Sequence, residues 1–108
     1  MAYVSRISSQ TVLETTNAEL NVLGEDRLIA LSATNKHTSN AIIISVYAIP
    51  SDNLKSGTDT DHLIWHTSLT ASSTSSFELH RSSINLSHFR LVASASAGSD
   101  VTLTVFGI

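Results

Sequence analysis

The sequence contains no cysteine, one proline and only four glycines among its 108 residues. The absence of cysteine excludes a disulfide framework, a thiolate metal site and a cysteine nucleophile. No glycine-rich phosphate loop and no Gly-x-Ser-x-Gly nucleophile motif occurs in the chain. The stability of the folded protein must therefore come from side-chain packing, from partners, or from both.

Charge is also scarce, since 14% of the residues are charged and the formal net charge is −3. The six basic residues are dispersed and no two are adjacent, so no basic patch of the kind that binds nucleic acid is predicted. No apolar run approaches the ~20 residues that span a bilayer. The N-terminus lacks the charged and apolar regions of a signal peptide. We therefore expect neither nucleic acid nor a membrane as a partner.

Serine and threonine are abundant, with 19 and 12 copies, and 42% of the residues are hydrophobic. Serine and threonine compete with helical hydrogen bonds, and β-branched side chains lose rotamer freedom in helices. A hydrophobic content this high with so little net charge supports a packed core rather than disorder. At the usual length of a single domain, the composition predicts one compact all-β domain.

Hydrophobic alternation with a period of two predicts the strands. The strongest segment is Ala41–Ile49, which has apolar residues on both faces and ends at Pro50. We count about eight such segments between polar turns and predict a single antiparallel β-sandwich, jelly-roll-like. The other segments are 18–23, 27–34, 61–69, 77–79, 89–95 and 101–106, with a further strand or arm within 1–16.

Three local expectations complete this fold. The segments 89–95 and 101–106 are separated by Ala97–Asp100, and we predict that they form an antiparallel hairpin. Residues 81–88 are expected to hold a short helical turn around Ile84 and Leu86. Residues 1–26 are interpreted as an N-terminal arm or first strands, and 27–108 as the sandwich, in one domain overall.

The order of several short motifs resembles that of a known class of proteins. The motifs are Thr-Asn at 34–35, Val-Tyr-Ala-Ile-Pro-Ser at 46–51, Leu-Ile-Trp at 63–65, Phe-Glu-Leu at 77–79, and the alternating C-terminal end from Arg90. Over about residues 27–108 the chain resembles small β-sandwich virion proteins of tailed bacteriophages. That class includes capsid decoration (cement) proteins and small tail or fibre components.

The resemblance implies a virion structural protein made in the host cytoplasm, with the outer surface of the head as its favoured place. It implies the major capsid protein or other virion subunits as partners, and a trimer that matches local three-fold points of the shell. Two alternatives stay open. One is a small tail, fibre or baseplate/adaptor component, and the other is a receptor- or glycan-binding β-module.

The sequence offers little chemistry for catalysis or metal binding. His62 and His66 are four residues apart in a strand pattern, which separates them by ~13 Å, too far for one ion bound at ~2 Å. The segment Asp59–His62 is acidic, but such loops are usually solvated turns. No pair of carboxylates is poised for glycoside chemistry. We expect no enzyme activity, no cofactor and no metal.

Apolar residues on the second face of strands predict an interface instead. Ile43, Tyr47 and Ile49 share the second face of the strongest strand, and Phe106 lies on the second face of the last one. A contiguous apolar stripe of this kind marks a contact surface. We therefore expect a homo-oligomer, with a trimer favoured. Of the other aromatic residues, Trp65, Phe77 and Phe89 are expected in the core.

The N-terminal segment is the second predicted contact. It carries Tyr3, Val4, Arg6 and Ile7 within a short span. The segment Ala2–Gln10 is interpreted as an arm that adds a strand to a neighbouring subunit or to the capsid. The alternative is that these residues form the first strand of their own sandwich.

Overall fold

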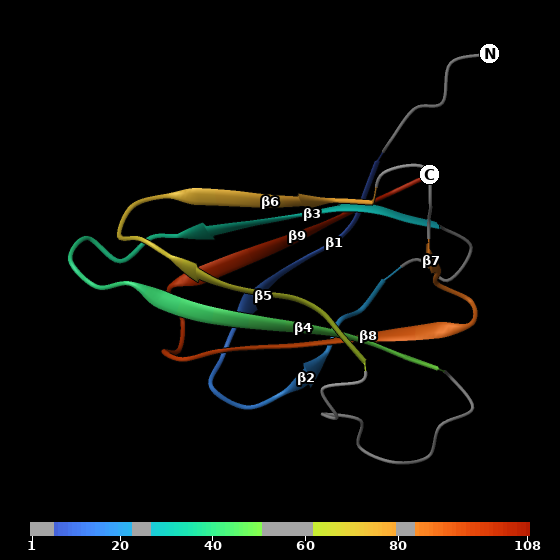
Figure 1. Ribbon diagram of the computed structural model, residues 1–108, viewed down its shortest axis with the longest axis horizontal. Coiled ribbons are helices and arrows are strands. Elements are labelled where there is room, and N and C mark those ends of the chain that lie inside the picture. The colour runs from blue at the N-terminus through green and yellow to red at the C-terminus, as the bar shows by residue number, and fades with distance from the viewer. Residues whose placement is uncertain (1–5, 23–26, 51–61, 80–83) are drawn as a thin grey trace.

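The computed structural model describes residues 6–22, 27–50, 62–79 and 84–108, and in them the chain forms two antiparallel β-sheets (Figure 1). The described residues include no α-helix, and hence no helix with the length and hydrophobicity of a membrane span. The strands are β1 (Arg6–Leu13), β2 (Ala18–Glu19), β3 (Arg27–Asn35), β4 (Ile42–Pro50), β5 (Leu63–Leu69), β6 (Thr74–Glu78), β7 (Ile84–Asn85), β8 (Phe89–Ala95) and β9 (Val101–Gly107).

The two sheets are wound together like a jelly roll. Sheet A has the order β1-β9-β3-β6, with the short β7 also pairing with β3, and sheet B has the order β2-β8-β4-β5. The chain crosses repeatedly between the sheets, and the first strand pairs with the last, with Arg6 opposite Gly107. The predicted antiparallel β-sandwich is confirmed. The eight predicted strands correspond to four strands in each sheet, and the short β7 is a ninth strand.

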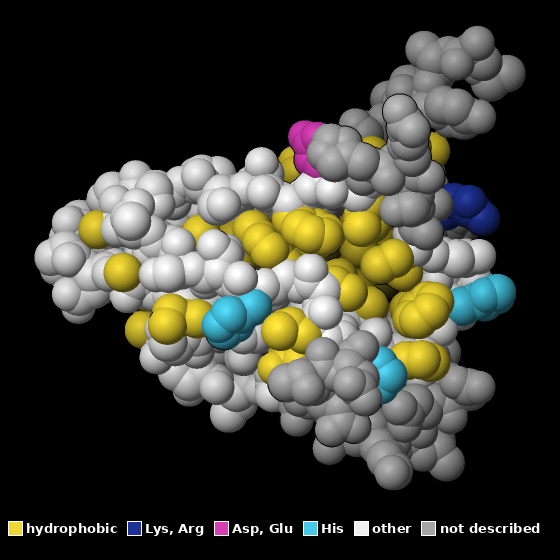
Figure 2. Space-filling view, viewed as in Figure 1, with side chains coloured by type: hydrophobic (Ala, Val, Ile, Leu, Met, Phe, Trp, Pro, Cys, Tyr) yellow, Lys and Arg dark blue, Asp and Glu magenta, His cyan; other side chains and the backbone are white. Residues whose placement is uncertain are grey.

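The core lies between the sheets, where alternate residues of every long strand point inward. Leu31, Ile44, Leu91 and Val105 have no exposed surface. Burial of apolar surface at ~25 cal/mol per Å² is the main force that holds the two layers together. Figure 2 shows hydrophobic side chains along the seam between the layers, seen from the side of the edge strands β5 and β6.

Aromatic residues help to close this seam. Trp65 on β5 is 9% exposed, and its ring centroid lies 6.0 Å from that of Phe77 on β6, with the planes tilted by 31°. Phe77 and Phe89 are half-buried and pack against the core. The predicted core position is confirmed for Trp65, whereas Phe77 and Phe89 lie at the margin of the core.

The predicted C-terminal hairpin is wrong, because β8 and β9 belong to different sheets. β8 pairs with β2 and β4, while β9 pairs with β1 and β3. Residues 96–100 therefore link one layer to the other. Alternation indicates that one side of each strand faces the core, and this holds equally for a hairpin and for a link across a sandwich.

The helical turn expected around Ile84 is also wrong. Ile84 and Asn85 form β7 and lie opposite Leu28 and Arg27 of β3. A turn follows, in which the backbone N–H of His88 donates to the Asn85 carbonyl at 3.0 Å. Residues 80–83 lie outside the described part of the chain.

The segment Arg6–Gln10, five of the nine residues of the predicted arm, lies in β1. The whole strand pairs with β9 of the same chain, from Arg6 opposite Gly107 to Leu13 opposite Val101. These residues therefore form the first strand of their own sandwich, which is the alternative interpretation given above.

One end of the sandwich is held by a buried amide. Asn35 has no exposed surface, and its Nδ2 donates to the carbonyls of Asn40 at 2.9 Å and Leu69 at 3.1 Å. Its Oδ1 accepts the backbone N–H of His37 at 2.9 Å. A buried amide with partners at both ends fixes the loop that follows β3 against the end of β5.

Candidate functional site

The outer face of sheet A exposes two large apolar side chains and brings together predicted contact residues from opposite ends of the sequence. Its side chains alternate along each strand with the core residues, and the strand register arranges them in three rows across β1, β9, β3 and β6. The rows are Ile7–Phe106–Ala30–Glu78, then Gln10–Thr104–Ser32–Ser76, then Val12–Thr102–Thr34–Thr74.

Two large apolar side chains protrude from this face at its β1 edge. Ile7 is 55% exposed and Val12 is 47% exposed. Ile7 lies opposite Phe106, which in turn lies opposite Ala30, and both of these neighbours are half-buried. Two predicted interface residues from opposite ends of the sequence, Ile7 and Phe106, are therefore adjacent on one surface.

A β-bulge in β1 places Ile7 on this face. Ile7 and Val12 are five residues apart, and in a regular strand an odd separation puts side chains on opposite faces. Between Ile7 and Ser9 the register shifts by one, because Ser8 is an extra residue in β1. Bulges re-aim the side chains beside them. As a result both Ile7 and Val12 point away from the core.

The remainder of the face is polar but nearly uncharged. Gln10 Nε2 donates to Thr104 Oγ1 at 3.1 Å, and the hydroxyls of Thr34 and Thr74 are 2.9 Å apart. Thr102 Oγ1 is buried and has no hydrogen-bond partner among the described residues. Of the twelve side chains in the three rows, one carries a formal charge, Glu78 at the β6 edge. Little ionic desolvation would oppose contact with another protein.

The outer face of sheet B offers less than the sequence predicts. Ile49 has no exposed surface, so its expected role as a contact residue is corrected: it is packed within its own chain. Tyr47 is half-buried, because its cross-strand neighbours Val92 and Leu63 flank it on both sides. Ile43 is 46% exposed but stands beside serines, with Ser68 directly opposite.

The position of Leu63 departs from simple alternation along β5. The pattern predicts that Leu63 shares the face of Trp65, but a bulge shifts the register of β5 between Val46 and Tyr47. Trp65 lies opposite Val46 on the core side, and Leu63 lies opposite Tyr47 on the outer side. Leu63 therefore helps to bury the Tyr47 ring.

The other predicted contact residues lie at the start of the chain. Arg6 is exposed at the first position of β1. Tyr3 and Val4 lie outside the described residues. Val12 is a site residue that the sequence analysis did not select. A usable signal was that Val12 directly precedes Leu13, because two adjacent apolar residues of a strand point to opposite faces.

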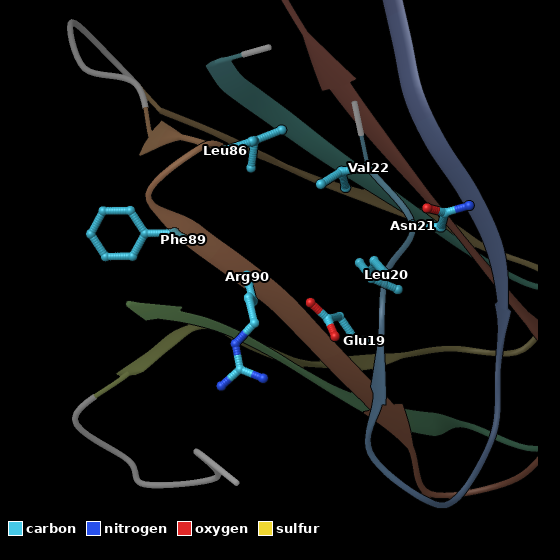
Figure 3. Close-up of a pocket in the computed structure, with 7 residues that line it drawn as sticks. All are labelled: Glu19, Leu20, Asn21, Val22, Leu86, Phe89 and Arg90. Atoms are coloured by element: carbon cyan, nitrogen blue, oxygen red, sulfur yellow. The ribbon is translucent and has the colours of Figure 1, made fainter. Parts of the chain in front are cut away.

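A cavity of about 430 Å³ opens beside β2 and the start of β8 (Figure 3). Leu20 and Leu86 form buried apolar walls, while Glu19 and Arg90 contribute opposite charges. The remaining lining residues are Asn21, Val22 and Phe89. Glu19 and Arg90 are the two charged side chains among these lining residues.

Two of the histidines, His37 and His66, make local structural contacts. His66 Nδ1 lies 2.9 Å from the hydroxyl of Ser45, and His37 Nδ1 accepts the backbone N–H groups of Ser39 at 3.1 Å and Asn40 at 3.0 Å. Within the described ranges no three His, Asp or Glu side chains gather closely enough to hold a metal ion.

Comparison with known protein families finds no matching family model, and comparison with curated proteins finds no significant match. The functional argument therefore depends on the fold and on the surface of the molecule.

Proposed function

We propose that this protein is a structural component of a tailed-bacteriophage particle, most specifically a decoration protein that binds and stabilises the head shell. Its partners are the major capsid protein or other virion subunits, and its place is the outer surface of the head. The observation that carries the proposal is the outer face of sheet A, where Ile7 and Val12 protrude from a surface with one charge in twelve residues.

The fold supports this proposal in a second way. This small jelly roll has no disulfides, and its edge strand β1 exposes Ile7 and Val12. An assembly partner that covers these two side chains removes their apolar surface from water and so adds stability. Self-association is part of the proposal. The trimer was expected from Ile43, Tyr47 and Ile49, and burial of Ile49 removes part of that support.

A small tail, fibre or baseplate/adaptor component is the alternative within the same class. Copy number separates the two, because a shell protein follows the symmetry of the head and is present in hundreds of copies, whereas a tail part is present in roughly a dozen. A receptor- or glycan-binding role gains no support from the described residues, since Tyr47, Trp65, Phe77, Phe89 and Phe106 are all buried or half-buried.

The test is binding to particles that lack the protein. We expect the unchanged chain to cosediment with them in hundreds of copies, the double variant Ile7→Glu/Val12→Glu to lose binding, and Ile43→Glu to retain it. Cosedimentation in roughly a dozen copies would favour the tail, and no binding by the unchanged chain would refute the virion role. Equal binding by the double variant would exclude this face as the assembly surface.

A further inference from the structure

We propose that the outer face of sheet A packs against the same face of a second copy of this chain. The two copies are related by a two-fold axis that runs across the strands, along the central row Gln10–Thr104–Ser32–Ser76. This inference rests on the proposed function in one point, that the face is an assembly surface, and it names a second copy of the chain as what covers the face. The dimer then contacts the particle through its other surfaces, and the double variant Ile7→Glu/Val12→Glu loses particle binding because it loses the dimer.

The symmetry of the three rows supports this axis. The rows lie at equal intervals along β9, at Phe106, Thr104 and Thr102. Rotation by 180° about the central row places the Ile7 row of one copy over the Val12 row of the other copy. Ile7 of one copy then meets Val12 of the other, and the same contact occurs twice, as an isologous interface requires. The two exposed large apolar side chains of the face, Ile7 and Val12, cover each other.

The polar residues fit the same arrangement. Ser32 and Ser76 each face their own copies, and a hydroxyl both donates and accepts hydrogen bonds, so it can pair with itself across a two-fold axis. Glu78 faces Thr74 of the partner, whose hydroxyl can donate to the carboxylate. A two-fold axis parallel to the strands would instead place Glu78 over Ile7 and desolvate a carboxylate against an apolar side chain. The axis across the strands is therefore favoured.

The size of the face sets the strength of this dimer. Four strands ~4.8 Å apart and five residues at ~3.4 Å each cover roughly 300 Å². A standard stable interface buries about 800 Å² per partner. We therefore expect a weak dimer in dilute solution, which is reinforced where copies are held close together on a larger assembly.

The chain has no cysteine, so an introduced cysteine is its sole thiol. Facing sheets lie ~10 Å apart, whereas a disulfide requires Cα atoms within ~7 Å. The probe is therefore a short bis-maleimide added to Ser32→Cys. The matched control is Ser94→Cys, a half-buried serine on the outer face of sheet B. We expect about tenfold more covalent dimer from Ser32→Cys, with the yield rising with protein concentration. Equal yields would overturn the proposed interface.

The orientation of the axis has its own test. A mixture of Ile7→Cys and Val12→Cys chains should give the mixed dimer in preference to either homodimer. The axis parallel to the strands predicts preferential linkage of Ile7→Cys to Glu78→Cys, and that result would overturn the proposed axis. These measurements use purified protein alone. Absence of the dimer with retained particle binding refutes this inference and leaves the proposed function, whereas a dimer without particle binding refutes the function.

Discussion

The outer faces of the two sheets contrast in a way that the sequence does not suggest. β4 in sheet B has the most hydrophobic sequence of any strand, and it was expected to carry the contact surface. In the structure its outer residues Tyr47 and Ile49 are half-buried and buried. β1 in sheet A has a weak pattern, yet it exposes Ile7 and Val12 more than any other large apolar residues described.

Position in the sheet explains the difference. β4 lies between β8 and β5, so the outer side chains in the middle of β4 have neighbours on two strands. Tyr47, for example, is flanked by Val92 and Leu63. β1 is an edge strand with β9 as its one neighbour, so Ile7 and Val12 are covered from one side only. Apolar residues in a central strand are therefore covered by neighbouring strands of the same sheet. Apolar residues in an edge strand stay exposed and indicate a contact surface.

The largest expected effect tests the buried half of this comparison. Ile49→Ala should lower the free energy of unfolding by about 2–5 kcal/mol, because it opens a cavity at a side chain with no exposed surface. Urea denaturation of the purified protein measures this loss. An unchanged midpoint would show that Ile49 is not packed and would return it to the candidate contact residues.

The exposed half of the comparison is tested by Ile7→Ser and Val12→Ser. Each should weaken self-association about tenfold, equivalent to about 1.4 kcal/mol, while unfolding changes by no more than about 0.5 kcal/mol. Sedimentation at several concentrations measures the first quantity and urea denaturation the second. A large loss of stability without a change in association would mean that these residues serve the fold.

Two threonines in one row sharpen the description of sheet A. Thr34→Val removes the 2.9 Å contact with Thr74 and should cost up to about 1 kcal/mol of unfolding free energy. Thr102→Val replaces a buried hydroxyl that has no partner among the described residues and should be neutral or stabilising. Thermal unfolding measures both variants, which carry the same type of substitution. The melting temperature should fall for Thr34→Val and should rise or stay unchanged for Thr102→Val.

The smallest effect is expected from Ile43→Ala, which is also the matched control for Ile49→Ala on the same strand and face. Ile43 is 46% exposed beside Ser68, so the free energy of unfolding should change by less than about 0.5 kcal/mol. Self-association should not change. Weaker association of Ile43→Ala would place the contact surface on sheet B instead.

The sequence by itself determined the all-β class, most strand positions and the core, because period-two alternation directly reports which side of a strand is apolar. It could not assign strand partners. The same alternation suits a hairpin and a link between layers, and so the segments 89–95 and 101–106 were paired wrongly.

The tertiary structure decided the candidate surface. A one-residue bulge at Ser8 turned Ile7 to the side of Val12, and pairing of the chain ends brought Ile7 against Phe106. Residues that are 99 positions apart, from 7 to 106, became neighbours through sheet order alone. Local alternation carries no information about such long-range register, since a shift of one residue reverses every face that it assigns.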